Sequence, residues 1–426
     1  MNCARTLATA GVSLLAATTV AWPSSALAQA GNPDCSTMTN PVYMAGTTAV
    51  VPVIRLLGAR LKQVNITLLW NETSEGCSAA EAFAKGFGGK PRTLYSMYEE
   101  SSPGKTVSTP CIDLQGVTPN LVINDVPYGS CYVAYSSGQG LPAGVAEFQG
   151  PVQGLVPIVS SLYTYYNDIT AEELQNLYVC GGQGGVMTFV DSASIYDYNS
   201  TTSGMRELFA RSIGFGNAST LSASIGDGAF NLLNAESMVT TRIAPTTKPD
   251  VTIGYTSTEY FDQYRSIVRG FKVRGLNQTL AYWPDSDMTS TDKVNIREGR
   301  YTIQGALRLV ANVDANGVVT HPIAKRIVNW FQGNLLDPSD VLPFDINEIY
   351  ALQGVVPQCA MKVAKDSDLP VFKHYQHPQP CHCKFQVLAT HKPSIPGCVA
   401  CTDLVTCPSG QLCSQGYCEQ APTATF

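Results

Sequence analysis

The sequence predicts an α/β protein whose strands and helices alternate and build mainly parallel sheets. Strand-like and helix-like patterns follow one another from residue 41 to residue 335. Hydrophobic residues make up 44% of the chain and charged residues only 14%, which is typical of a well-buried globular protein. A chain of 426 residues is too long for one small core, so we expect two domains and an appendage.

The first half of the chain contains strand and helix patterns in alternation. Residues 41–61 indicate a strand, a turn and a helix, and residues 120–127 indicate a strand that ends near Asp125. Thr170 has the N-cap position of a helix over 169–179. Three further segments are a strand over 64–71, a short helix that begins over 78–83 and an apolar strand over 154–162.

The second half adds strands over 252–257, 271–276 and 301–313. An amphipathic helix is predicted over 321–335, with one apolar face made of Ile323, Ile327, Trp330 and Phe331.

The N-terminus has the organisation of a secretory signal peptide. Arg5 supplies the positive start, residues 7–20 are apolar or small, and residues 26–30 offer small-x-small cleavage sites. We therefore expect residues 1–30 to be removed and the mature protein to be periplasmic or secreted. No other stretch approaches the roughly 20 apolar residues that a membrane span requires.

The cysteines are unevenly distributed. Of fourteen, Cys3 precedes the predicted cleavage site, five are scattered over the body, and eight crowd into the last 70 residues. In an oxidising compartment this pattern indicates a disulfide-rich C-terminal module, and the odd mature total implies one free or intermolecular thiol. The alternative interpretation of the tail is a metal site. Its candidate ligands are His374, His377, Cys381, His382, Cys383, Cys398 and Cys401. Because an exported chain favours disulfides, we expect no bound metal.

Several functional classes find no support in the sequence. The formal charge is −6 and no basic run occurs, so no nucleic-acid partner is expected. Neither a G-x-S-x-G nor an H-E-x-x-H motif is present, and His321 is the one histidine between residues 31 and 358. We interpret His321 as a histidine at a helix start rather than a member of a catalytic triad. We interpret residues 181–185, GGQGG, as a turn rather than a phosphate-binding loop. We therefore expect no catalysis and no cofactor.

Three hydroxyl-rich turns precede predicted helices, namely residues 46–48, 74–78 and 200–204. Each can simply cap its helix, but helix N-termini also bind anions through their free N–H groups and partial positive charge. Asp125 adds an acid at a strand end, where ligands of open α/β sheets usually lie. A carboxylate there can accept the proton of a protonated oxyanion and reject an oxyanion that has none.

These segments, in this order, resemble the phosphate-binding periplasmic component of ABC transporters, a type II solute-binding family. The resemblance covers roughly residues 41–340. It is carried by seven stretches, AGTTAVVP, LLWNETSEGCSAAEAF, LVINDVPYGSC, ITAEELQNLYVCG, YNSTTSGMREL, TIGYTS and REGRYTI. The tail is similar to cysteine-rich endings of solute-binding-like proteins of myxobacterial type.

The resemblance implies a two-domain, periplasmic-binding-protein-like type II fold with mixed or parallel sheets and a ligand cleft between two lobes. Lobe 1 is expected over 31–152 and 266–352, lobe 2 over 153–265, and the disulfide-rich module over 353–426. Crossing strands are expected near 145–155 and 262–272. The ligand contacts that it implies are Thr47, Thr48, Ser74, Asp125, Ser203, Gly204 and Arg206.

The chain departs from the family's phosphate site at several of these positions. Asn199 stands where the family has an arginine, and Met205 stands where a threonine follows the glycine. Asn124 replaces a serine, Gly76 occupies a position where a serine often contacts ligand, and Thr302 replaces a proline. Loss of a guanidinium removes a charge-assisted bidentate contact to phosphate, and Arg206 is the one nearby cation that could substitute.

The expected function is therefore capture of phosphate or a related small oxyanion by an exported protein that delivers it to a membrane permease. The alternative is a secreted or surface interaction protein that kept the scaffold and lost the ligand. An exported phosphatase is a third hypothesis, which the single body histidine disfavours.

Overall fold

The computed structural model describes most of the chain beyond the predicted signal peptide. The described residues are 31–71, 74–86, 89–102, 104–131, 140–181, 188–189, 191–198, 203–221, 235–334, 342–365, 369–402 and 407–421. Asn199, residues 200–202 and most of the 181–185 turn lie outside them, as do residues 1–30. No helix in the described part is both long enough and apolar enough to span a bilayer.

One nine-stranded mixed sheet runs through the molecule in the order β4-β3-β2-β1-β5-β11-β6-β8, with β9 also paired to β6. β1 pairs in parallel with β2 and β5, and the other neighbours are antiparallel. The strands are β1 Pro41–Gly46, β2 Thr67–Trp70, β3 Thr93–Ser102, β4 Lys105–Asp113, β5 Leu121–Asn124, β6 Val145–Ser160, β8 Gly254–Ser257, β9 Val268–Gly270 and β11 Gln304–Asn312.

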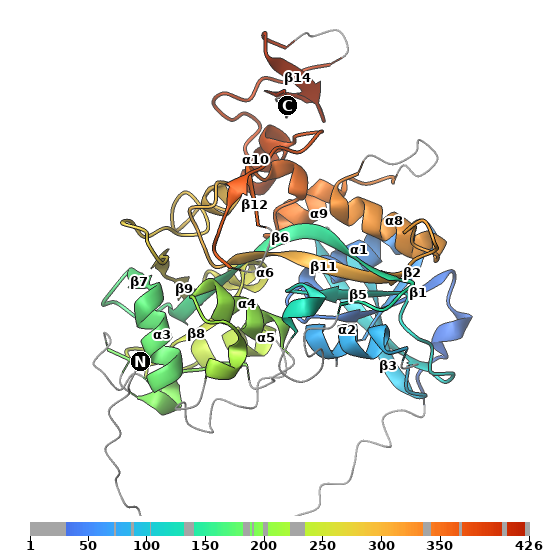
Figure 1. Cartoon of the computed structure of the whole chain (residues 1–426), viewed down its shortest axis with the longest axis horizontal. Coiled ribbons are helices and arrows are strands. Elements are labelled where there is room, and N and C mark those ends of the chain that lie inside the picture. Colours follow the sequence, from blue (N-terminus) through green and yellow to red (C-terminus); the bar gives the residue numbers. More distant parts are fainter. Residues whose placement is uncertain are drawn as a thin grey trace, which may run out of the picture.

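β6 connects the two halves of this sheet. Its first part, Val145 to Gly154, pairs with β11, whereas Leu155 to Ser160 pair with β8 and β9. Figure 1 shows β6 crossing the middle of the molecule between these two groups of strands. Residues 154–160 of the predicted strand over 154–162 are thus the end of one strand of 16 residues, which begins earlier than the sequence predicts.

The helices cover the sheet on both sides of this crossing. α1, α8 and α9 contribute to a hydrophobic cluster with β1, β2 and β5, and α3, α4 and α6 contribute to a second cluster with the distal half of β6. The helices are α1 Val51–Lys62, α2 Gly76–Ala84, α3 Ala171–Cys180, α4 Gly204–Ser212, α5 Ala235–Ser237, α6 Thr258–Tyr264, α7 Val294–Arg297, α8 Pro322–Gln332, α9 Ile346–Leu352 and α10 His382–Thr390.

Two local predictions about helix starts are confirmed. Thr170 caps α3 in a capping box, since its side chain accepts the N–H of Glu173 while Glu173 accepts the N–H of Thr170. His321 is the N-cap of α8, where Nδ1 accepts the N–H of Ala324 at 3.2 Å. That bond gives His321 a structural role at a helix start.

The β3–β4 hairpin is absent from the elements predicted from the sequence. Its paired strands, Thr93–Ser102 and Lys105–Asp113, form the edge of the large sheet. Charged and hydroxyl residues interrupt the apolar ones in both strands, so the alternation that marks a half-buried strand is weak.

Segment 268–274 lies beside the distal part of the sheet. β9 pairs with β6, and β10 Lys272–Arg274 pairs in parallel with β7 Asp168–Thr170. These strands follow the predicted boundary at residue 265, yet they pair with strands on the lobe 2 side of the crossing. β6 extends to Ser160, so the residues just after the predicted boundary still have a neighbouring strand with which to pair.

The C-terminal segment is bonded by four disulfides, as the predicted module requires. It contains α10 and two small hairpins, β12 Val363–Ala364 with β13 Lys373–His374 and β14 Gln411–Ser414 with β15 Tyr417–Gln420. Figure 1 shows this segment stacked above β6 and β11. The pairs are Cys359–Cys381, Cys383–Cys398, Cys401–Cys413 and Cys407–Cys418.

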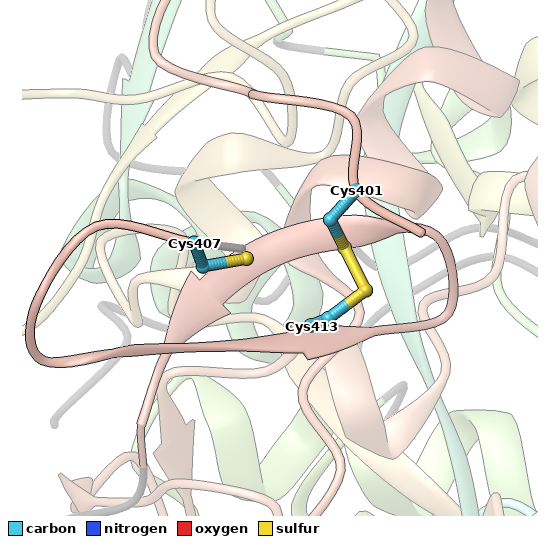
Figure 2. A group of neighbouring side chains, drawn as sticks. All are labelled: Cys401, Cys407 and Cys413. Atoms are coloured by element: carbon cyan, nitrogen blue, oxygen red, sulfur yellow. A yellow bond between two sulfur atoms is a disulfide. The ribbon is translucent and has the colours of Figure 1, made fainter. Parts of the chain in front are cut away.

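In the described part of the tail, the four cysteines proposed as ligands of the alternative metal site all form disulfides. Cys401, Cys407 and Cys413 have sulfurs close enough to hold one ion, and Figure 2 shows the bond between Cys401 and Cys413. Cys407 is bonded to Cys418, so none of the three offers a thiolate. His382 directs Nδ1 to the carbonyl oxygen of Ala360 at 3.0 Å.

Two further disulfides join the N-terminal part, Cys35–Cys111 and Cys77–Cys131. Cys180 is disulfide-bonded as well, and no cysteine among the described residues is free. The unpaired thiol expected from the odd mature count is therefore not found in this part of the chain.

Gly46 provides a test of how tightly β1 and β5 approach. Its φ is +143°, and a Cβ there would lie 1.9 Å from the carbonyl oxygen of Ile123. We predict that Gly46→Ala lowers the free energy of unfolding by about 3 kcal/mol, since strain and strand separation both oppose folding. Gly129→Ala is the control because no atom lies within 4 Å of its Cβ position, and it should change stability by less than about 1 kcal/mol. Equal losses in denaturant titrations of the two variants would contradict this account.

Candidate functional site

Four chain turns meet where β6 crosses between the two halves of the sheet. They follow β1 and β5 and open α2 and α4. A Cβ on Gly204 would lie 2.5 Å from Asn124 Oδ1 and 2.6 Å from Asp125 Oδ2, and one on Gly76 would lie 2.3 Å from Asn124 Oδ1. The Asn124 carboxamide is therefore enclosed between the first residues of two helices, which only glycine permits.

We call this cluster the junction site and define it as Thr47, Asn124, Asp125, Gln153, Gly204 and Glu259. All the side chains in this set are buried; none is more than 2% exposed. Gln153 Nε2 donates to Asp125 Oδ1 at 2.5 Å, and Asn124 Nδ2 donates to the carbonyl oxygen of Val126 at 2.9 Å. The cluster is polar and closed to solvent.

Asp125 has an unusual environment for a carboxyl group. Its Oδ2 has no hydrogen bond of ordinary geometry, although the residue is only 1% exposed and donors from Thr47 and Met205 lie close by. Burial raises the pKa of Asp125 to about 6, and the nearby Thr47 hydroxyl, Gln153 amide and Met205 N–H lower it by less. At neutral pH the group is mostly ionised and holds unused acceptor capacity.

Glu259 is the second buried carboxyl group of the site. Thr258 Oγ1 donates to Glu259 Oε2 at 3.3 Å, while Oε1 has no partner. The pKa of Glu259 is raised to about 8. Burial is the largest cause, and the charge of Asp125 contributes to the same increase. At pH 7 Glu259 is therefore mostly protonated and can donate a hydrogen bond, whereas Asp125 accepts.

The structure brings three of the expected contacts together and directs others elsewhere. Thr47, Asp125 and Gly204 meet in the junction site. Ser74 Oγ accepts the N–H of Gly46 at 2.7 Å and so braces the turn after β1, and Thr48 is half-buried in that turn. Ser203 Oγ accepts the N–H of Arg206 at 3.3 Å, as an N-cap of α4 does.

Arg206 belongs to a different buried cluster. Its Nε lies 2.8 Å from Asp197 Oδ2, and its NH2 group donates to the carbonyl oxygen of Leu221 at 3.0 Å. Asp197 also accepts the hydroxyl of Tyr255 at 2.6 Å. In the described conformation the Arg206 charge is thus balanced by Asp197 and is not directed at the junction site.

Sequence reasoning missed Gln153 and Glu259. Gln153 is a polar residue of β6 just before its apolar run, and Glu259 follows β8 at the start of α6. An acid after an apolar strand was the signal that drew attention to Asp125, and the same signal was available for Glu259. Their approach to Asp125 depends on the crossing of β6, which no local pattern predicts.

Comparison with known proteins leaves the family open. No protein-family model and no curated protein matches the chain. The chain is similar to a solved structure from Clostridium perfringens that is described as a phosphate ABC transporter substrate-binding protein with bound phosphate. The two sequences are 13% identical and the TM-score is 0.46. The match covers 75% of this chain and 99% of the other.

Two other solved structures have comparable likeness. One is an ABC-type phosphate transport receptor from Vibrio cholerae, at 13% identity, TM-score 0.41, and coverage of 74% and 99% of the respective chains. The other is a full-length OxyR variant from Pseudomonas aeruginosa, at 8% identity, TM-score 0.36, and coverage of 71% of both chains. At these values the function has to be argued from the residues of this chain.

The two buried carboxyl groups predict how stability depends on pH. Their folded-state pKa values of about 6 for Asp125 and about 8 for Glu259 lie above the ordinary 3.8 and 4.5. These two groups therefore bind more protons in the folded state than in the unfolded state between these limits, so their contribution to stability is greatest below about pH 4 and falls as pH rises toward 8. Glu259→Gln cannot ionise and should be more stable than wild type at pH 9 by about 3 kcal/mol.

Denaturant titrations of wild type and Glu259→Gln at pH 5 and pH 9 measure this difference. At pH 5 the two proteins should agree within about 1 kcal/mol. A difference that is the same at both pH values would contradict a buried, ionising Glu259.

Proposed function

We propose that this protein is an exported, non-catalytic binding protein that captures a small protonated oxyanion of the phosphate class at the junction site. The observation that carries the proposal is the buried Asp125 carboxylate, whose Oδ2 faces the start of α4 and has no hydrogen bond of ordinary geometry, although Thr47 and the Met205 N–H lie nearby. Buried polar atoms without partners are rare and point to a missing water, ion or ligand. Gln153 Oε1 and Glu259 Oε1 in the same site also have no hydrogen-bond partner of ordinary geometry.

The two carboxyl groups suit an oxyanion that carries both a proton and a charge. Ionised Asp125 would accept the hydroxyl of the ligand, and protonated Glu259 would donate to a charged oxygen. The N–H groups at the start of α4 add positive partial charge. A fully deprotonated oxyanion such as sulfate has no proton for Asp125 and would be repelled by it.

Binding requires that the halves on either side of β6 separate. Gly204 packs directly on Asp125 in the described conformation, so a ligand enters only when α4 moves away from β5. β6 and its partner strands would act as the hinge, with closure over the ligand. This proposal keeps two lobes, one over 31–152 with 266–352 and one over 153–265. It also keeps delivery to a membrane permease, a periplasmic location, and ligand contacts that form on closure from Thr48, Ser74, Ser203 and Arg206.

A second candidate function is a surface interaction protein that has lost its ligand. It is favoured by Asn124, whose carboxamide fills the space between Gly76 and Gly204. Arg206 is committed to Asp197, so the described part of the site offers an anion no balancing arginine. In this alternative the junction site is a permanently closed core, and the cysteine-rich tail carries the interaction.

Calorimetric titration of the mature protein with phosphate, arsenate and sulfate separates the two candidates. The capture hypothesis predicts heat with phosphate and arsenate and none with sulfate. Asp125→Asn should weaken phosphate binding at least about tenfold, since the amide cannot serve as a charged acceptor. Affinity should also fall above about pH 8, where Glu259 ionises.

Asn124→Ser is the matched variant for the alternative. If wild type gives no heat at millimolar phosphate and Asn124→Ser does, the Asn124 side chain blocks the site in the wild type, and this result supports the interaction protein. If phosphate binds to wild type and Asp125→Asn equally well, the ligand lies elsewhere and the junction site is rejected.

A further inference from the structure

A second hollow lies away from the junction site, between the sheet and the C-terminal segment. It has a volume of about 600 Å³, within the range of ligand pockets. Its walls come from β6, the end of α8 and the chain around residues 375–379. Five of its nine lining residues carry a carboxamide, and we call it the carboxamide groove: Gln149, Gln332, Asn334, Gln358 and Gln379.

The wall that the tail contributes is held in place by several bonds. β12 pairs with β13 through Val363 and His374, and the N–H of Tyr375 donates to the carbonyl oxygen of Lys362 at 3.0 Å. Gln376 Nε2 reaches the carbonyl oxygens of Gln420 and Ala421 at 3.1 and 3.0 Å. The groove is thus a built feature that exists only because the tail folds back over the sheet.

None of the described side chains that line the carboxamide groove is charged at neutral pH. These described residues include neither an acid nor a lysine or arginine. Their single histidine, His377, is buried, which lowers its pKa, and Nδ1 accepts the N–H of Gln379 at 3.0 Å. Arg308 and Lys365 line an adjoining cavity of about 20 Å³, which shares Gln149, Gln358 and Ala364 with the groove and has room for a water molecule only. Within the groove itself, the described lining offers a charged ligand no counter-charge.

The groove combines free carboxamides with an aromatic ring. The side chains of Gln149 and Gln379 make no hydrogen bond to other described residues, so their donors and acceptors are available. Tyr375 is half-buried beside His377, with ring centroids 6.5 Å apart. Paired donors and acceptors match neighbouring hydroxyl groups, and an aromatic face packs against an apolar ring face.

We propose that the carboxamide groove binds a short uncharged oligosaccharide. Sugars are rich in hydroxyl groups, carry no charge and present apolar C–H faces, which are the three properties that the lining selects. A neutral peptide shares the lack of charge but brings fewer hydroxyl groups. The proposal is independent of the junction site and assigns the tail a role as one wall of a glycan site.

The test is a calorimetric and ligand-observed NMR titration of the mature full chain with chitotriose, maltotriose and cellotriose, and with a blocked neutral tetrapeptide. At least one trisaccharide should bind. Gln149→Ala and Gln379→Ala should each weaken it about fivefold, as expected for one lost hydrogen bond. Tyr375→Ala should weaken it at least about tenfold, and Tyr375→Phe less than about twofold, because the ring face remains.

Gln115→Ala, an exposed glutamine outside the groove, is the control and should bind like wild type. Melting temperatures of all variants identify any that fail to fold, and Tyr375→Phe keeps the ring test informative if Tyr375→Ala unfolds. The proposal is overturned if no trisaccharide binds at 10 mM, a concentration about tenfold above a weak millimolar Kd. It is also overturned if only the peptide binds, or if Gln149→Ala and Gln379→Ala bind as tightly as wild type.

Discussion

The rest of the structure depends on β6, which pairs with β11 over its first part and with β8 and β9 over its second. The change of partners falls at Gln153 and Gly154. Gln153 donates to Asp125 from this point, and the N–H of Gly154 donates to Thr258 Oγ1, which in turn contacts Glu259. One strand therefore positions both carboxyl groups of the junction site, and any opening of the molecule has to bend it.

Burial gives these two carboxyl groups different roles. Both are almost inaccessible, yet the pKa of Asp125 rises to about 6 and that of Glu259 to about 8, so one accepts and the other donates at neutral pH. The close approach of Gly204 to Asp125 keeps water out and makes their desolvation severe. Both candidate functions follow from this arrangement: either a ligand satisfies the unpartnered oxygens after opening, or the closed state is permanent and tolerates them.

The tail is more closely integrated with the body than its disulfide pattern suggests. Val356 forms a backbone bridge with Val152 of β6, and Gln358 donates to the carbonyl oxygen of Gly150. Cys359 and Cys381 then tie the following chain to α10. These contacts lay residues 375–379 along the sheet and create the carboxamide groove, which neither the body nor the tail contains alone.

The sequence by itself determined the α/β class, the positions of several strands and helices of the body, the cap at Thr170 and the disulfide-rich tail, because these depend on local periodicity, capping chemistry and cysteine spacing. It also drew attention to Thr47, Asp125 and Gly204. Tertiary structure alone decided that Gln153 and Glu259 join them, that Arg206 pairs with Asp197, and that Asn124 fills the space between two helix starts. These outcomes depend on which distant segments meet at the β6 crossing and on how closely their backbones approach, and neither is encoded in any single stretch of residues.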